Sequence, residues 1–64
     1  MSSSVLLEAR LRVGLSRAEA ARRSGTSRSA LLSYETGAVS PTLATATRIL
    51  AAYGFRLVLA NLTR

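Results

Sequence analysis

The apolar residues of this 64-residue chain recur with a helical period, in four successive stretches of about ten residues each. The positions expected to face a shared core are Leu7 and Leu11 in the first stretch, Ala20 and Ala21 in the second, Leu31 and Tyr34 in the third, and Leu43, Ala46, Ile49, Leu50 and Tyr53 in the fourth. Leu15 and Val39, in the turns between stretches, are expected to close the ends of that core. The pattern predicts an all-α fold built from short helices.

Glycines and hydroxyl residues mark the ends of these stretches. A glycine follows each one, where a left-handed backbone commonly closes a helix: Gly14, Gly25, Gly37 and Gly54. A serine suited to cap a helix N-terminus precedes each one: Ser4, Ser16, Ser27 and Ser40. Glu19 completes a capping box with Ser16, and Pro41 stands at the first helical position after Ser40. We therefore expect four helices, over Val5–Val13, Arg17–Ser24, Arg28–Thr36, and from Pro41 to just before Gly54.

The period changes after Gly54. Residues 55–60 are apolar except for Arg56, with Phe55, Leu57 and Leu59 on one face and Arg56 opposite, and this alternation predicts a strand. A lone strand leaves its backbone unpaired, and the simplest partner is the same strand of a second copy. A fifth short helix or a frayed tail is the alternative.

This pattern divides the chain in two. Residues 1–54 are expected to form a helical domain, and residues 55–64 a dimerisation strand and tail. The interface of the dimer is predicted to contain Phe55, Leu57, Val58 and Leu59.

Charge is the strongest signal in the composition. Nine arginines face three glutamates, there is no lysine, and the formal net charge is +6. A high-GC genome explains the choice of arginine over lysine, but not the excess of cations over anions. The excess predicts binding to polyanions, with nucleic acid ahead of a membrane surface. At this length a single core is small, so tight helix packing or a second copy has to supply stability.

The residue inventory argues against an enzyme. The chain has no His, Cys, Asp or Lys, and its only carboxylates are Glu8, Glu19 and Glu35. No nucleophile–base pair, metal-ligand cluster or phosphate-binding glycine loop can be assembled from these residues, so we expect neither a cofactor nor a metal. The N-terminus does not resemble a signal peptide, and no apolar run has the roughly 18 residues of a membrane span. We therefore expect a cytoplasmic protein that binds no membrane.

The turn between the second and third stretches suggests how DNA is bound. Ser24-Gly25-Thr26-Ser27 has the length and the glycine of a helix-turn-helix turn. In such a unit the second helix enters the major groove with its N-terminal residues against the base edges. Here that helix begins Ser27-Arg28-Ser29, which suits groove entry. An ordinary helical hairpin with a polar exposed face is the alternative.

Four runs of residues carry a family resemblance: Gly14 to Ala21, Gly25 to Leu31, Tyr34 to Gly37, and Ser40 to Leu43. In this order and spacing they resemble the Cro/lambda-repressor-type helix-turn-helix proteins, also called the XRE family. The resemblance spans residues 5–54 and implies a four-helix, lambda-repressor-like fold that binds double-stranded DNA. The ending Gly54 to Leu59 is similar to HipB-like antitoxins, whose C-terminal strands pair across a dimer.

The resemblance also implies which residues contact DNA. Arg17 stands where the family usually has a Gln that holds the phosphate backbone. Ser27, Arg28 and Ser29 match positions that contact bases and phosphates, and Arg28 is expected to bind guanine O6 and N7. Leu32 either meets a thymine methyl or belongs to the core. Ser33 is expected to approach a phosphate.

Other charged residues have structural roles in this interpretation. Arg10 and Glu35 match a partly buried ion pair of the family that locks the first helix to the end of the third. Arg22 and Arg23 favour the C-terminal dipole of the second helix. Arg12 and Arg48 are left unassigned.

Three hypotheses follow for function. The first is a dimeric transcription regulator, most often a repressor in this family, on a palindromic operator. The second is an antitoxin that neutralises a partner toxin protein and autoregulates its operon. The third is a helix-turn-helix used only for protein contact, or a piece of a longer protein.

Overall fold

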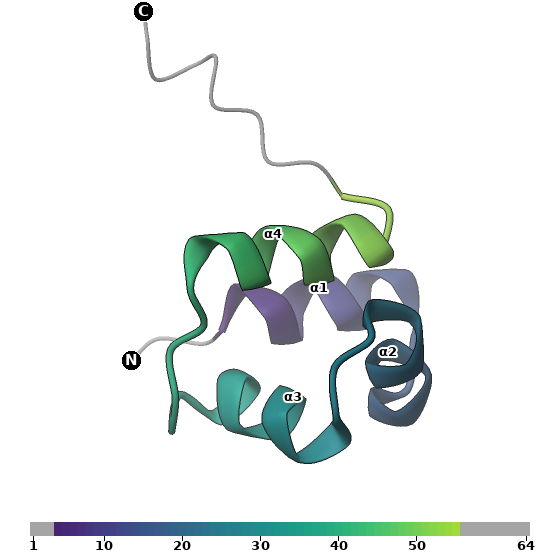
Figure 1. Ribbon diagram of the computed structural model, residues 1–64. Coiled ribbons are helices and arrows are strands. Elements are labelled where there is room, and N and C mark those ends of the chain that lie inside the picture. Colours follow the sequence, from purple (N-terminus) through teal and green to yellow (C-terminus); the bar gives the residue numbers. More distant parts are fainter. Residues whose placement is uncertain (1–3, 56–64) are drawn as a thin grey trace, which may run out of the picture.

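The computed structural model describes residues 4–55, which form four helices (Figure 1). They are α1 (Val5–Val13), α2 (Arg17–Ser24), α3 (Arg28–Thr36) and α4 (Leu43–Ala52). No strand occurs among these residues, so the prediction of an all-α fold is confirmed for the described part of the chain. The segment predicted to pair as a strand across a dimer lies, from residue 56 onward, outside it. None of the four helices is long and apolar enough to cross a membrane.

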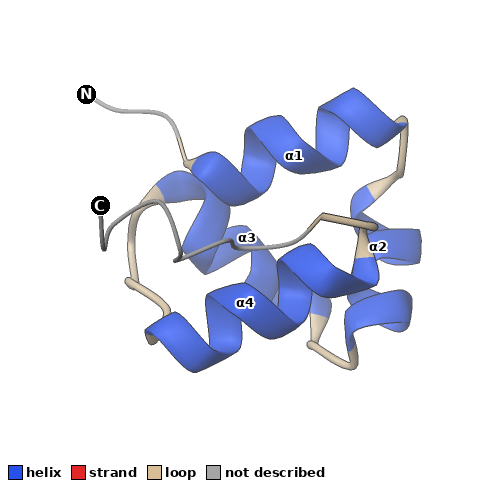
Figure 2. Ribbon diagram, turned by 90° about the horizontal axis from the view of Figure 1, so that it is seen from above, coloured by secondary structure: helices blue, strands red, loops and turns tan. Residues whose placement is uncertain are grey.

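Each helix packs against two others. Both α1 and α2 contact α3 on one side and α4 on the other. In the view of Figure 1, α4 forms the upper edge of the bundle and α3 the lower edge, and Figure 2 shows α1 running alongside α4. This arrangement buries the inner face of α3 and leaves its outer face uncovered.

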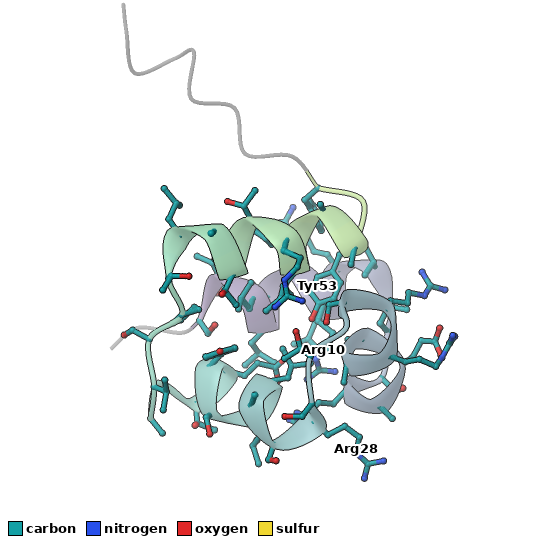
Figure 3. The ribbon with its side chains drawn as sticks, viewed as in Figure 1. Arg10, Arg28 and Tyr53 are labelled. Carbon is teal, nitrogen blue, oxygen red and sulfur yellow. The ribbon has the colours of Figure 1, made fainter. Side chains whose placement is uncertain are left out.

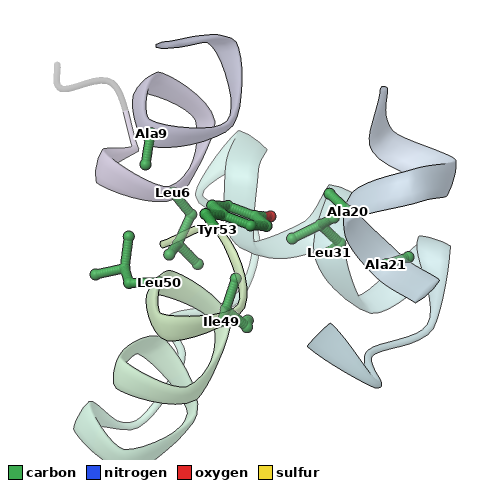
Figure 4. Packing of buried hydrophobic residues seen from close by; sticks show 8 residues of the cluster. All are labelled: Leu6, Ala9, Ala20, Ala21, Leu31, Ile49, Leu50 and Tyr53. Atoms are coloured by element: carbon green, nitrogen blue, oxygen red, sulfur yellow. The ribbon is translucent and has the colours of Figure 1, made fainter. Parts of the chain in front are cut away.

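Side chains from all four helices meet in one core (Figure 4). Its buried apolar members are Leu6, Ala9, Ala20, Ala21, Leu31, Ile49, Leu50 and Tyr53, and Leu15, Tyr34, Ala52 and Phe55 pack against them. The two alanines of α2 bring its backbone close to its neighbours, as their small size predicts. The predicted core positions in α2 and α3 are therefore confirmed, as are Leu15 and the last three positions of the α4 stripe.

Four core predictions need correction. In α1 the inward positions are Leu6, Ala9 and Arg10, whereas Leu7 is half-buried and Leu11 is 62% exposed. This helix has apolar residues on more than one face, and the face that turns inward is the one on which Leu6 and Ala9 lie beside the ion-paired Arg10. Leu43, at the start of α4, and Val39, in the turn before it, are also exposed, because the part of α4 that faces the core is its second half, with Ile49 and Leu50.

The caps agree with prediction at three helices and differ at the fourth. The hydroxyls of Ser4, Ser16 and Ser27 accept backbone N–H groups at the starts of α1, α2 and α3. At α4 the cap is Thr42, whose Oγ1 accepts the Thr45 N–H at 3.1 Å. The helix therefore begins at Leu43, after Pro41, and the predicted start at Ser40–Pro41 is wrong.

The predicted capping box is half present. Ser16 accepts the backbone N–H of Glu19, but the Glu19 carboxylate binds Arg22 and Arg23 instead of the Ser16 backbone. Two guanidinium groups on the same helix add the attraction between opposite charges to their hydrogen bonds with this carboxylate, and a neutral backbone N–H lacks that attraction.

Candidate nucleic-acid interface

The turn between α2 and α3 is short and held from several sides. Gly25 has a φ of +66°, a left-handed conformation that favours glycine, and Thr26 donates its N–H to the Ala21 carbonyl at 3.0 Å. The Ser24 hydroxyl donates to the Ala20 carbonyl at 2.8 Å. From α4, Arg48 Nη1 donates to the Ser24 carbonyl. The angle between the two helices is therefore fixed by backbone geometry and by a side chain of a third helix.

The first turns of α3 divide into an inner and an outer face. Leu31 and Glu35 are buried, whereas Arg28 and Ser29 are exposed and Leu32 is 43% exposed. Figure 3 shows Arg28 extending away from the bundle, while Arg10 and Tyr53 point into it. Among the described residues Arg28 has no hydrogen-bond or ion-pair partner. The outer face therefore offers an unpaired guanidinium beside small polar groups.

The serines of this region differ in their exposure and in the hydrogen bonds that they already make. Ser27 Oγ accepts the Ala30 N–H at 3.1 Å as the helix cap, so its hydroxyl proton remains available as a donor. Ser29 is exposed and Ser33 half-buried. The predicted contact residues of α3 thus lie at its N-terminal end and along one side, with Leu32 on the exposed side rather than in the core.

Behind this surface three charged side chains meet. Arg10 of α1 donates to both carboxylate oxygens of Glu35, from Nε at 2.7 Å and from Nη2 at 3.0 Å. Its Nη1 donates to the Leu15 carbonyl at 2.9 Å. Arg17, the first residue of α2, donates from Nε to Glu35 Oε1 at 3.1 Å. The Glu35 carboxylate therefore ties α1, α2 and the end of α3 together.

The surroundings of this cluster perturb its titration. Burial raises the pKa of Glu35, but the hydrogen bonds from Arg10 and Arg17 outweigh burial and leave that pKa below its ordinary value. The hydrogen bond to Glu35 raises the pKa of Arg10. Burial, with the charge of Glu35 adding to it, raises the pKa of Tyr53, whose hydroxyl makes no hydrogen bond within the described part. Glu35 is therefore an anion at neutral pH.

The structure brings together some predicted residues and separates others. Arg10 and Glu35, predicted as a pair, are in contact, and Arg17 joins them. Sequence reasoning missed the Arg17–Glu35 and Arg48–Ser24 contacts, because they join residues 18 and 24 positions apart that share no periodic pattern. The sequence held one sign of the second contact. Ser24 ends a helix, and the carbonyl of a last helical residue needs a donor from outside the helix.

The predicted dimerisation residues are described only in part. Phe55 packs against the core of its own chain and donates its N–H to the Leu50 carbonyl at 2.9 Å. Leu57, Val58 and Leu59 lie outside the described residues, as does Arg56.

The comparison with protein families agrees with this geometry. A family model described as helix-turn-helix matches residues 6–59, which is most of the chain. The comparisons with curated proteins and with solved structures gave no match. The match covers the capped turn, the exposed outer face of α3 and the helices that hold them. The chain therefore belongs to the XRE-type helix-turn-helix family and is a DNA-binding transcription regulator.

Proposed function

We propose that the chain recognises a specific palindromic operator as a dimer and acts there as a repressor. The observation that carries the proposal is the outer face of α3, where Arg28 is exposed and has no partner among residues 4–55, on a helix whose direction is fixed by its turn. An exposed arginine held on a rigid helix suits bidentate hydrogen bonding to guanine O6 and N7. The family resemblance favours repression over activation.

The other contacts follow from the position of each side chain. Ser29 and Leu32 lie on the same exposed side as Arg28, so they face the neighbouring bases, and Leu32 suits a thymine methyl. Ser27 at the start of α3 and Ser33 along its side suit the phosphates that flank the groove. Arg17 at the start of α2 suits a phosphate as well.

The dimer accounts for a palindromic site. Two recognition helices related by a two-fold axis enter successive major grooves about 34 Å apart. The sequence of residues 55–60 supplies a candidate strand for pairing with a second copy.

The test is fluorescence anisotropy on a duplex from the region upstream of the gene, against a scrambled duplex, at several salt concentrations. We expect the native duplex to bind tighter by a factor of roughly 10³ or more. Arg28→Ala should abolish that preference and keep the weak, salt-sensitive binding. The matched control is Arg12→Ala, which removes an exposed arginine from α1. Equal binding of the parent protein to both duplexes would reject operator recognition.

A second candidate, an antitoxin with a toxin partner, is favoured by one surface observation. Val5, Leu11 and Leu43 on α1 and α4 are each more than 60% exposed, and exposed apolar groups suit a protein partner. Co-expression with the product of the neighbouring gene tests this candidate. Formation of a stable complex that relieves toxicity would support it, and the absence of both effects would reject it.

A further inference from the structure

We propose that Glu35 is a positioning residue for DNA binding, which holds Arg17 by its Nε so that the terminal amino groups of Arg17 bind a backbone phosphate. The inference rests on the proposed function in taking Arg17 as a phosphate contact. It adds that the contact is prepared by a buried carboxylate of the recognition helix.

The first argument is that Glu35 does not need Arg17 for its own neutralisation. Arg10 already binds both carboxylate oxygens, and the Glu35 side chain is only 1% exposed. Two arginines share one carboxylate, so one positive charge is left over. The exposed member of the cluster is Arg17, at 40% against 9% for Arg10, and the surplus charge therefore lies on the solvent side.

The second argument is that Arg17 does not serve its own helix. As the first residue of α2 it lies at the positive end of the helix dipole, where a cation is unfavourable. The surplus charge of the cluster and the positive end of the helix dipole therefore lie together, and both favour an anion from outside.

The third argument is geometric. Arg17 uses only Nε toward Glu35, and its two terminal amino groups have no hydrogen-bond partner among the described residues. A guanidinium fixed at Nε presents these groups in a plane, which matches two oxygens of a phosphate. Glu35 also belongs to α3, so the phosphate contact and the base-contacting helix are joined through one side chain.

Two substitutions of Arg17 test the inference in the intact protein. Arg17→Ala, which removes every donor of the side chain, should weaken binding to native and scrambled duplexes equally, roughly tenfold, and lower the salt slope by about 1. Arg17→Lys keeps the charge but lacks Nε–H, so its ammonium is drawn to the carboxylate. We expect it to recover less than half of the lost affinity on a logarithmic scale. Arg12→Ala and Arg12→Lys are the matched controls, and there the lysine variant should bind as the parent does.

Each outcome decides the matter. If Arg17→Ala binds with unchanged affinity and salt slope, Arg17 is not a phosphate contact and the inference is overturned. If Arg17→Lys binds as the parent does, charge alone suffices and positioning by Glu35 is overturned. In Glu35→Gln, at a temperature where circular dichroism shows intact helices, Arg17→Ala should cost less affinity than in the parent. If this variant does not fold, the lysine variant carries the test.

The test is separable from operator recognition, because every duplex has phosphates. Failure of the parent to prefer its native duplex, with the Arg17 pattern intact on both duplexes, would reject the operator and keep the positioning role. A preference of the parent for its native duplex, with Arg17→Ala behaving as the parent, would support operator recognition and reject the positioning role.

Discussion

Glu35 is the residue on which most of the structure depends. It is the buried anion of the described part, and it receives hydrogen bonds from two arginines that belong to two other helices. Breaking a buried ion pair by removing one partner costs about 3–5 kcal/mol, since the other charge is left unpaired in the interior. For a chain of this size that is a large share of the total stability.

The lowered pKa of Glu35 predicts how stability depends on pH. Its folded pKa lies below the unfolded value of 4.5, so its contribution is complete above that value and is lost as pH falls through the folded pKa. Urea unfolding between about pH 7 and about pH 2 measures this loss. Glu35→Gln should be less stable at neutral pH by about 3 kcal/mol and should show a flatter acid limb.

The control for this experiment is Glu19, whose pKa is also lowered, by hydrogen bonds from Arg23 and Arg22. Glu19 is only half-buried and its arginines are exposed, so about 1 M salt should screen its effect and leave that of Glu35 in place. An acid limb that is unchanged in Glu35→Gln would assign the pH dependence to another group.

At the residue scale, the sequence predicted which residues have a role better than it predicted which residues they contact. Arg10 and Glu35 could be paired through the family resemblance. Arg17 was assigned to phosphate alone, because nothing in its neighbourhood shows that its Nε meets a carboxylate 18 residues later. Contacts of this kind depend on how helices cross, which local patterns do not encode.

At the scale of the elements, the ends of the helices carry most of the local information. The bounds of α1, α2 and α3 agree with prediction, because each has a serine cap and a glycine of positive φ. The start of α4 was misplaced because Ser40–Pro41 and Thr42 offer competing caps. The face of α1 was misplaced because Val5, Leu7 and Leu11 compete with Leu6 and Ala9 for the interior.

The cap of α4 gives a sharp prediction, because the two candidate residues can be compared directly. Thr42→Ala removes the acceptor of the Thr45 N–H and should lower the free energy of unfolding by about 1 kcal/mol. Ser40→Ala, two residues earlier and exposed, should change it by less than about 0.5 kcal/mol. Thermal and urea unfolding of the two variants measure the difference. A larger loss for Ser40→Ala would place the cap where the sequence pattern had it.

For the whole molecule, small size and high net charge both limit the stability of the folded chain. Eight buried apolar residues form the described core, three of them alanines, and the chain as a whole carries a net charge of +6. A core of this size leaves little stability to spare, and like charges repel one another in the folded chain. A second copy or a bound duplex would offset both effects.

The proposed dimer predicts a melting temperature that rises with protein concentration, because dissociation accompanies unfolding. When the protein concentration is raised about a hundredfold, we expect the melting temperature, measured by circular dichroism, to increase by several degrees. Leu57→Asn, in the predicted pairing segment, should remove the dependence. Leu43→Asn changes an exposed leucine of α4 and is the control. A melting temperature independent of concentration in the parent would show that the free chain is a monomer.

The short turn between α2 and α3 limits how far the protein can change shape when it binds DNA. Residues 25–27 are all that separate α2 from α3, and a side chain of α4 holds the carbonyl that begins the turn. The connection between these two helices is too short to move toward a displaced base or phosphate. A mismatch in shape between protein and DNA therefore has to be relieved by bending of the duplex. We therefore expect the bendability of base pairs that the protein never touches to enter its affinity, as sequence selectivity through DNA stiffness.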